Sequence, residues 1–373
     1  MIESRRLELS PSEERAVLAR RLAQITPVEA PMRQPGQRPL VVLIGGPPGS
    51  GKSTTQWLLQ QSLGPSVAVY DFDDDITAHP RYDAIMRSRG LRAADDLAQY
   101  LPRGMMVRCL QHLRAGEPQY DVIASAPLHR VPVAKGWIDG FRAVDYRVAL
   151  AYVVTHEANC RLGRASRYQQ AVDDTGAGRW VRTDLAELAY RLVPDTVHEL
   201  EATAAVDDLY IVDRDGYVLY ENQRADDGRM PGPYQAKDTV LAERNRPPTP
   251  AEHDQFLATA LPLLDRGDRL PAPVIAEVRA AMTRHEARGE PSSHPQAAPT
   301  HLTDVGRRLA DAGRLDARLT DVQRVASAGI AAPGAIRAPE TRTTPEVAGG
   351  SPNPGGSPNP GVDRPARGGD LTR

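Results

Sequence analysis

The stretch Leu40-Val-Val-Leu-Ile-Gly-Gly-Pro-Pro-Gly-Ser-Gly-Lys-Ser53 decides the fold of this 373-residue chain. Its first five residues are an unbroken apolar run, which is typical of a buried central strand in a parallel sheet. The run leads into Gly46-Pro-Pro-Gly-Ser-Gly-Lys-Ser53, which matches the pattern Gly-x-x-x-x-Gly-Lys-Ser/Thr. A helix is expected from Ser53 to Leu63. The motif therefore lies between a strand and a helix, as a phosphate-binding loop of this type requires.

Each residue type in this loop has a physical reason to bind a polyphosphate. Glycines let successive backbone N–H groups turn inward around phosphate oxygens, and the following helix presents its positive N-terminus to the same anion. Lys52 is expected to contact the β and γ phosphates, and the Ser53 hydroxyl to join a Mg²⁺ ion. We predict that ATP and Mg²⁺ are bound here, and that the nucleotide-binding residues are Gly46, Pro47, Pro48, Gly49, Ser50, Gly51, Lys52, Ser53 and Thr54.

Apolar runs and helical patterns alternate on both sides of the loop. Further strands are predicted at 67–70, 120–124 and 146–155, with a hairpin formed by 209–212 and 217–220. Helices are predicted at 10–24, 81–89, 93–114 with a break at Pro102, 157–172 and 184–201. This alternation indicates an α/β fold with a doubly wound, mostly parallel sheet of the P-loop kinase type.

Composition divides the chain into four predicted parts. Residues 1–37 hold an N-terminal helix and loop, and residues 38–223 form the kinase-like domain. Residues 224–330 form a polar extension with helices at 250–264, 273–288 and 302–327. Residues 331–373 are rich in Pro and Gly and repeat Gly-Gly-Ser-Pro-Asn-Pro twice between Gly349 and Pro360. Such a tail buries too little apolar area to order, so we predict that it is disordered.

Charge and composition exclude several classes of partner. Lys and Arg number 46 against 48 Asp and Glu, so there is no electrostatic case for nucleic acid. No apolar run approaches the roughly 20 residues that span a bilayer. The charged start of the chain lacks the apolar segment of a signal peptide. Cys109 and Cys160 are expected to be reduced thiols, and the protein to be cytoplasmic.

An acidic cluster follows the second predicted strand as Asp71-Phe-Asp73-Asp74-Asp75. Ligands of doubly wound sheets bind outside the carboxyl ends of the strands. A carboxylate here can accept the proton of an attacking hydroxyl or hold Mg²⁺ through water, and the alternative is a solvated turn or helix N-cap. Asp71 is our first choice for the base because it follows the strand directly. Asp73 is the second choice, and with Ser53 it is our candidate metal ligand.

Arginines after the fourth strand are candidates to neutralise the transferred phosphate. Arg161, Arg164 and Arg167 are spaced by three and share a helical face, and Arg179 follows a Gly-Ala-Gly turn. The alternative for each is a basic residue on a surface helix. His79 precedes Pro80 and is interpreted as a turn residue. The nine histidines show no metal-ligand spacing, so no zinc site is predicted.

The ordered set of motifs from about Arg38 to Asn222 resembles the zeta toxins, P-loop kinases that phosphorylate the sugar of UDP-N-acetylglucosamine. The resemblance rests on the phosphate loop, Tyr70-Asp-Phe-Asp73 with His79-Pro80, Ser166-Arg-Tyr168, Gly178-Arg-Trp-Val181 and the hairpin Tyr210–Tyr220. It implies that Asp71 is the base and that Arg167 and Arg179 clamp the transferring phosphate. It also implies a small antitoxin as a protein partner.

The chain departs from the family on the acceptor side. The family has a glutamate at the end of the third strand, where this chain has Ala124, and another in the preceding helix, where 101–115 contains no acid. A buried site that lacks such a group discriminates poorly for its former ligand. The expected acceptor is thus a nucleotide or nucleotide-sugar. The alternatives are a kinase of another acceptor, such as an antibiotic or a dinucleotide, and a nucleotide-binding module without transfer chemistry.

Overall fold

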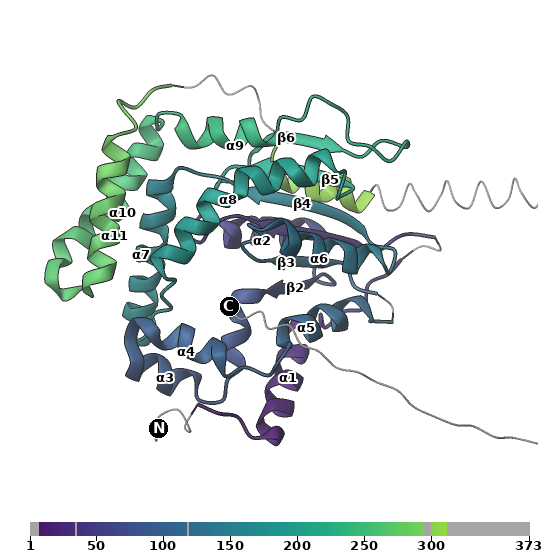
Figure 1. Cartoon of the computed structure of the whole chain (residues 1–373), viewed down its shortest axis with the longest axis horizontal. Helices are drawn as coiled ribbons and strands as arrows, with labels where there is room; N and C mark the ends of the chain where they lie inside the picture. The colour runs from purple at the N-terminus through teal and green to yellow at the C-terminus, as the bar shows by residue number, and fades with distance from the viewer. Residues whose placement is uncertain (1–6, 34–35, 118, 294–299, 312–373) are drawn as a thin grey trace, which may run out of the picture. The chain divides into compact units, whose positions relative to one another are not determined.

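A six-stranded sheet forms the centre of the fold (Figure 1). Its strands are β1 Leu40–Gly45, β2 Ala68–Asp71, β3 Val122–Ser125, β4 Arg147–Val153, β5 Asp208–Val212 and β6 Val218–Gln223. They are ordered β2-β3-β1-β4-β5-β6, and β6 alone runs antiparallel to its neighbour. The predicted α/β fold and its hairpin are confirmed. The strand with the phosphate loop lies in the middle of the sheet.

The structure is a computed structural model that describes residues 7–33, 36–117, 119–293 and 300–311. The predicted tail over 331–373, with its repeat, lies outside the described residues. So do residues 312–327 of the last predicted helix.

Helices occupy most connections between the strands. They are α1 Pro11–Ile25, α2 Lys52–Leu63, α3 Tyr82–Arg89, α4 Ala93–Gln99, α5 Met105–Arg114, α6 Val131–Arg142, α7 Glu157–Thr175, α8 Thr183–Ala202, α9 Ala236–Asn245, α10 Pro250–Arg266 and α11 Ala272–Glu286. Short 3₁₀ helices are η2 Phe72–Ala78, η3 Gly90–Arg92 and η4 Gly267–Arg269. A further helix covers 302–311. The sequence did not lead us to predict α6 or α9.

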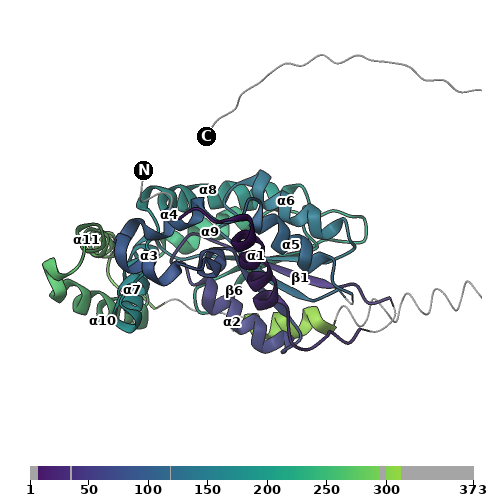
Figure 2. The ribbon, with the colours of Figure 1, turned by 90° about the horizontal axis from the view of Figure 1, so that it is seen from below.

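Both faces of the sheet are covered, because the central strands are apolar on both sides. Val41 and Leu43 of β1 face a core shared with α1, α5, α6, α8 and α9. Val42 and Ile44 face the opposite core, which α2 and the 302–311 helix complete. Figure 2 shows α1, α5, α6 and α8 on one side of the sheet, and α2 with the yellow-green helix on the other. This arrangement is the predicted doubly wound sheet.

The C-terminal helices α10 and α11 pack against α7 rather than against the sheet (Figure 1). Their shared core includes Leu162 of α7, Phe256 and Leu263 of α10, and Val274 and Val278 of α11. The same core holds Trp180, which follows Arg179 directly. The extension therefore contacts both the helix and the loop that carry the candidate arginines.

The predicted start of α1 is confirmed in detail. Ser10 caps the helix in a capping box with Glu13, and Pro11 is its first residue. Both cysteines are buried free thiols. Among the residues that the structure describes, no helix is long and apolar enough to cross a membrane.

Candidate active site

The phosphate loop joins β1 to α2, and close packing explains its glycines. Gly46, Gly49 and Gly51 have φ of +139°, +84° and +110°, a region that side chains disfavour. A Cβ at Gly49 would lie 2.2 Å from the Cys160 carbonyl oxygen, and one at Gly46 would lie 2.7 Å from that of Val153. The loop is thus held tightly against the end of β4 and the first turn of α7.

Lys52 lies across this loop as its first helical residue. Its Nζ donates to the carbonyl oxygens of Gly46 and Pro47 at 3.1 and 3.2 Å. Burial lowers the pKa of Lys52, while the nearby carboxylates of Asp73 and Asp71 act in the opposite direction. The amine is therefore held at the mouth of the loop, where a phosphate bound to the backbone N–H groups would meet it.

The Ser50 side chain is evidence that the loop is built for a polar ligand. Ser50 is fully buried, yet its Oγ has no hydrogen-bond partner among the described residues. A buried hydroxyl without a partner costs free energy, and such groups usually have a bound water or ligand nearby. An anion in the loop would satisfy it.

Asp71 is the last residue of β2, whereas the sequence pattern predicted a strand that ends at Tyr70 with Asp71 just after it. Its Oδ1 accepts a hydrogen bond from the Asp73 N–H at 2.8 Å and caps η2. Burial, followed by the neighbouring charges of Asp73 and Asp74, raises the pKa of Asp71 to about 6. The carboxylate is therefore a stronger proton acceptor than an exposed aspartate.

Asp73 pairs with the predicted lid arginine. Arg179 forms an ion pair with the Asp73 carboxylate and donates to its backbone carbonyl. Although burial acts to raise it, the pKa of Asp73 is lowered by Arg179 and then by Lys52. Arg179 therefore lies beside the site with its charge paired to a carboxylate.

The three arginines of α7 fall into two groups by their contacts. Arg161 and Arg164 donate to the buried carboxylate of Glu277 on α11, at 2.9 and 2.6 Å. Arg167 makes no hydrogen bond or ion pair with any residue of the described ranges, and its side chain is exposed. Of the three, Arg167 alone lines the cavity at the phosphate loop.

Seven of the predicted site residues line this cavity, which has a volume of about 160 Å³. The predicted residues that do not line it are Gly46, Pro47, Pro48, Ser50, Thr54 and Arg179. The loop, β2, η2, α7 and the β5–β6 turn contribute side chains to it. It is lined by Gly49, Gly51, Lys52, Ser53, Asp71, Asp73, Gly163, Arg167 and Arg214. Arg214 was not predicted from the sequence, because no local pattern places the hairpin turn that carries it against the loop.

Ser53 and Asp73 satisfy the donor chemistry that Mg²⁺ needs. In nucleotide sites this ion is bound through one or two carboxylates and by the phosphates of the substrate. Ser53 and Asp73 line the same cavity, so a hydroxyl and a carboxylate are available together. Within the described ranges, no group of three or more His, Cys, Asp or Glu could hold a metal ion by itself.

The other polar candidates have structural partners. Asp75 is buried, pairs with Arg21 at 2.9 Å and accepts a hydrogen bond from the Tyr70 hydroxyl. His79 is also buried, and its Nδ1 accepts from the Arg81 N–H at 3.1 Å. Asp75 therefore fixes η2 onto α1, and His79 stabilises the turn before α3.

A larger cavity of about 820 Å³ has Asp73 in common with the phosphate-loop cavity, and Arg179 also lines it. Its walls are mostly apolar and come from η2, α4, α5, α6 and α8. Four of the apolar side chains that line it are exposed to solvent, namely Phe72, Val107, Val133 and Leu185. On strand β3, which ends at Ser125 and so one residue later than predicted, Ala124 is fully buried in the core of the sheet. The cavity is large enough for a small molecule beside Asp73.

Comparisons with known proteins agree with this arrangement. A family model described as Zeta toxin matches residues 24–225, more than half of the chain. The chain is 23% identical over 217 residues to Toxin PezT of Streptococcus pneumoniae, covering 58% of this chain and 83% of PezT. It is 22% identical over 187 residues to Toxin zeta of Streptococcus agalactiae, covering 50% of this chain and 64% of that protein.

A solved structure of the PezAT chromosomal toxin-antitoxin system of Streptococcus pneumoniae has a similar fold. The TM-score is 0.56 at 19% identity, and the match covers 69% of this chain and 98% of the other.

Proposed function

The chain belongs to the zeta toxin family, and from that premise we propose that it is an ATP- and Mg²⁺-dependent kinase that phosphorylates a hydroxyl of a nucleotide-sugar such as UDP-N-acetylglucosamine. One observation carries the proposal. Phosphate loop, lysine, two carboxylates and an unpaired arginine all line the same cavity of about 160 Å³.

The proposed mechanism is in-line transfer of the γ-phosphate, in which positioning and electrostatics supply most of the catalysis. Asp71 accepts the proton of the acceptor hydroxyl, and its raised pKa supports that role. Lys52 and Arg167 contact the transferred phosphate. Arg179 joins them after leaving Asp73, which is then free to act with Ser53 as a metal ligand. Ser53 and Asp73 would hold Mg²⁺, and the ion would supply positive charge near the phosphates.

The test is transfer of labelled phosphate. We expect the purified chain, incubated with γ-labelled ATP, Mg²⁺ and UDP-N-acetylglucosamine, to yield a labelled nucleotide-sugar. Lys52→Ala should abolish the product because it removes the charge on the phosphates. Absence of any labelled product with this acceptor and with a small-molecule extract would leave no support for a kinase.

A different acceptor is the second candidate. Two points favour it: the family resemblance implies a glutamate where this chain has Ala124, and the 820 Å³ cavity has an apolar rim. A nucleotide-sugar needs polar partners, whereas this rim suits an acceptor with an apolar body. A labelled product from the extract but not from UDP-N-acetylglucosamine would decide for this candidate.

We also propose that the chain acts as the toxin of a toxin–antitoxin system, since a similar solved structure comes from such a system. Expression in a bacterial host should arrest growth, and Lys52→Ala should relieve the arrest. Growth that is unaffected by the wild-type chain would contradict this assignment without touching the kinase proposal.

A further inference from the structure

A second cavity continues from the phosphate-loop cavity toward the C-terminal helices. Its volume is about 340 Å³, within the range of small-molecule pockets. Gly163, Arg167 and Arg214 line both cavities. A ligand whose phosphates occupy the loop would therefore extend into this second space.

Two helix faces form its walls. Residues of α7 spaced by three and four line one side, namely Asn159, Leu162, Gly163, Ser166, Arg167 and Gln170. Residues of α10 with the same spacing line the other, namely Glu252, Gln255, Phe256 and Thr259. Gly163 brings α7 close to the loop, since a Cβ there would lie 2.8 Å from the Gly49 carbonyl oxygen.

The junction of the two cavities carries unpaired positive charge. Neither Arg167 nor Arg214 makes a hydrogen bond or ion pair with another residue of the described ranges. Arg214 lies against the loop, with its Cβ 3.2 Å from the position of a Cβ at Gly51. Two free guanidinium groups at this point suit a polyphosphate that passes from one cavity to the other.

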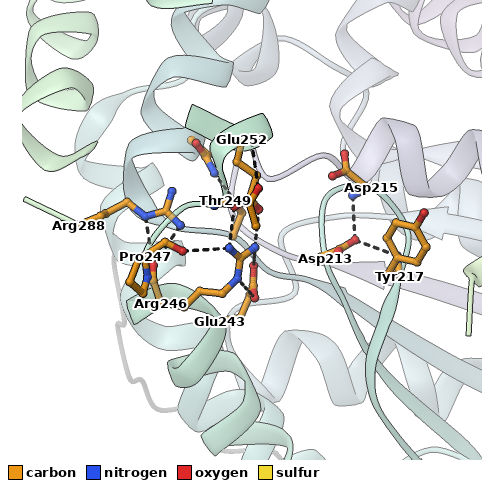
Figure 3. Close-up of polar contacts among 11 residues, drawn as sticks. Asp213, Asp215, Tyr217, Glu243, Arg246, Pro247, Thr249, Glu252 and Arg288 are labelled. Atoms are coloured by element: carbon orange, nitrogen blue, oxygen red, sulfur yellow. Dashed lines mark hydrogen bonds and ion pairs between the residues drawn. The ribbon is translucent and has the colours of Figure 1, made fainter. Parts of the chain in front are cut away.

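A network of charged residues fixes the first turn of α10 (Figure 3). Thr249 and Glu252 form a capping box, and Glu252 also pairs with Arg246, which bonds Glu243 as well. Arg288 donates to the Arg246 carbonyl oxygen at 3.2 Å. The wall is therefore held in place before any ligand binds. Figure 3 also shows the turn of Asp213 and Asp215, and Asp215 lines the cavity with Glu252.

We propose that this second cavity binds the nucleoside of the bound nucleotide and that α10 forms its outer wall. The proposal rests on the proposed function, and it gives a binding role to a helix that lies beyond the 24–225 match. The buried side chains of Leu162 and Phe256 form an apolar floor for a base. Hydrogen bonds are available from the amide of Gln255 and from the amide oxygen of Gln170, whose NH2 group donates to Asp174 at 2.9 Å. The exposed Asp215 carboxylate is available to a ribose hydroxyl.

Calorimetry with ATP and with inorganic tripolyphosphate, both with Mg²⁺, tests this. Thr259 is half-buried and lines the cavity, so Thr259→Trp fills the space of the base. We expect it to weaken ATP binding by about tenfold or more, the loss of one stacked base, while tripolyphosphate binds as in the wild type. The matched control is Ala258→Trp, on the exposed side of the same helix, which should bind both ligands normally.

Lys52→Ala separates this inference from the proposed function, because it should weaken both ligands. ATP binding that survives Lys52→Ala would overturn the proposed function itself. Unchanged ATP binding by Thr259→Trp would overturn the assignment of α10. An equal loss of ATP and tripolyphosphate in Thr259→Trp would overturn it too, since the substitution would then act on the phosphate site.

Discussion

Asp71 lies in an environment that disfavours its charged form. Its carboxylate is largely removed from water and lies beside two other aspartates, which raises its pKa to about 6. A base is most useful when its pKa is near the working pH. We expect kcat/KM to rise with pH through about 6 and then level, because the deprotonated carboxylate is the active form. Asp71→Asn should lower kcat by about 100-fold or more while ATP affinity stays close to wild type.

The same carboxylate should weaken the folded state at neutral pH. Because its pKa in the folded protein exceeds the ordinary value of 3.8, the native state binds more protons between these pH values, and the free energy of unfolding falls as the pH rises toward 6. Asp71→Asn should therefore stabilise the protein at pH 7 by on the order of 1 kcal/mol, after allowing for solvent screening, and not at pH 3. Denaturant unfolding at pH 7 and at pH 3 measures this difference in stability. Asp254→Asn, at an exposed position, is the control. A stabilisation equal at both pH values would contradict the link to Asp71 ionisation.

Helices α7, α8 and α11 meet at a single buried carboxylate, that of Glu277. It accepts hydrogen bonds from Arg161, Arg164 and Thr183, the first residue of α8. Glu277 thereby holds α7 and α8, and the loop that carries Arg179 connects these two helices. Without this carboxylate the buried Arg164 guanidinium loses its ion-pair partner, whereas Arg161 keeps Glu157 and Glu187. Glu277→Gln should therefore lower the free energy of unfolding by about 3 kcal/mol. Denaturant unfolding against Glu286→Gln, an exposed position on α11, measures this. Equal effects of both substitutions would show that Glu277 is not the anchor.

These elements also show how far local sequence patterns reach. The loop motif, the apolar runs and the Asp71 cluster predicted the strands and the core of the site, because each depends on adjacent residues. The partner of Arg161 and Arg164 lies 116 and 113 residues further along, so spacing alone suggested catalytic roles for them. Helix α6 contains Gly136 and Gly140, which disfavour a helix. Burial of its Trp137, Ile138 and Phe141 outweighs that preference.

At the scale of the whole molecule, the chain returns to its own sheet after the C-terminal helices. The 302–311 helix belongs to the same compact unit as the sheet. It buries Leu302, Val305 and Leu309 in the core that it shares with α2 and β1. The 302–311 helix packs closely on α2 at Gly306, where an added Cβ would lie 2.6 Å from the Ser62 Cβ. A segment far from the phosphate loop in sequence thus supports the helix that begins at Lys52.

This arrangement predicts that the late helix stabilises the complete unit. Leu309 is 3% exposed, so Leu309→Ala should leave a cavity and lower the free energy of unfolding by about 2–4 kcal/mol. Arg307→Ala, at an exposed position of the same helix, should change it little. Circular dichroism and tryptophan fluorescence should report the same midpoint in both variants, because the three tryptophans lie in different parts of the unit. Trp57 is on α2, Trp137 is on the opposite face of the sheet, and Trp180 is in the core of α7, α10 and α11. An early fluorescence change in Leu309→Ala would instead mean that the helix detaches while the sheet stays folded.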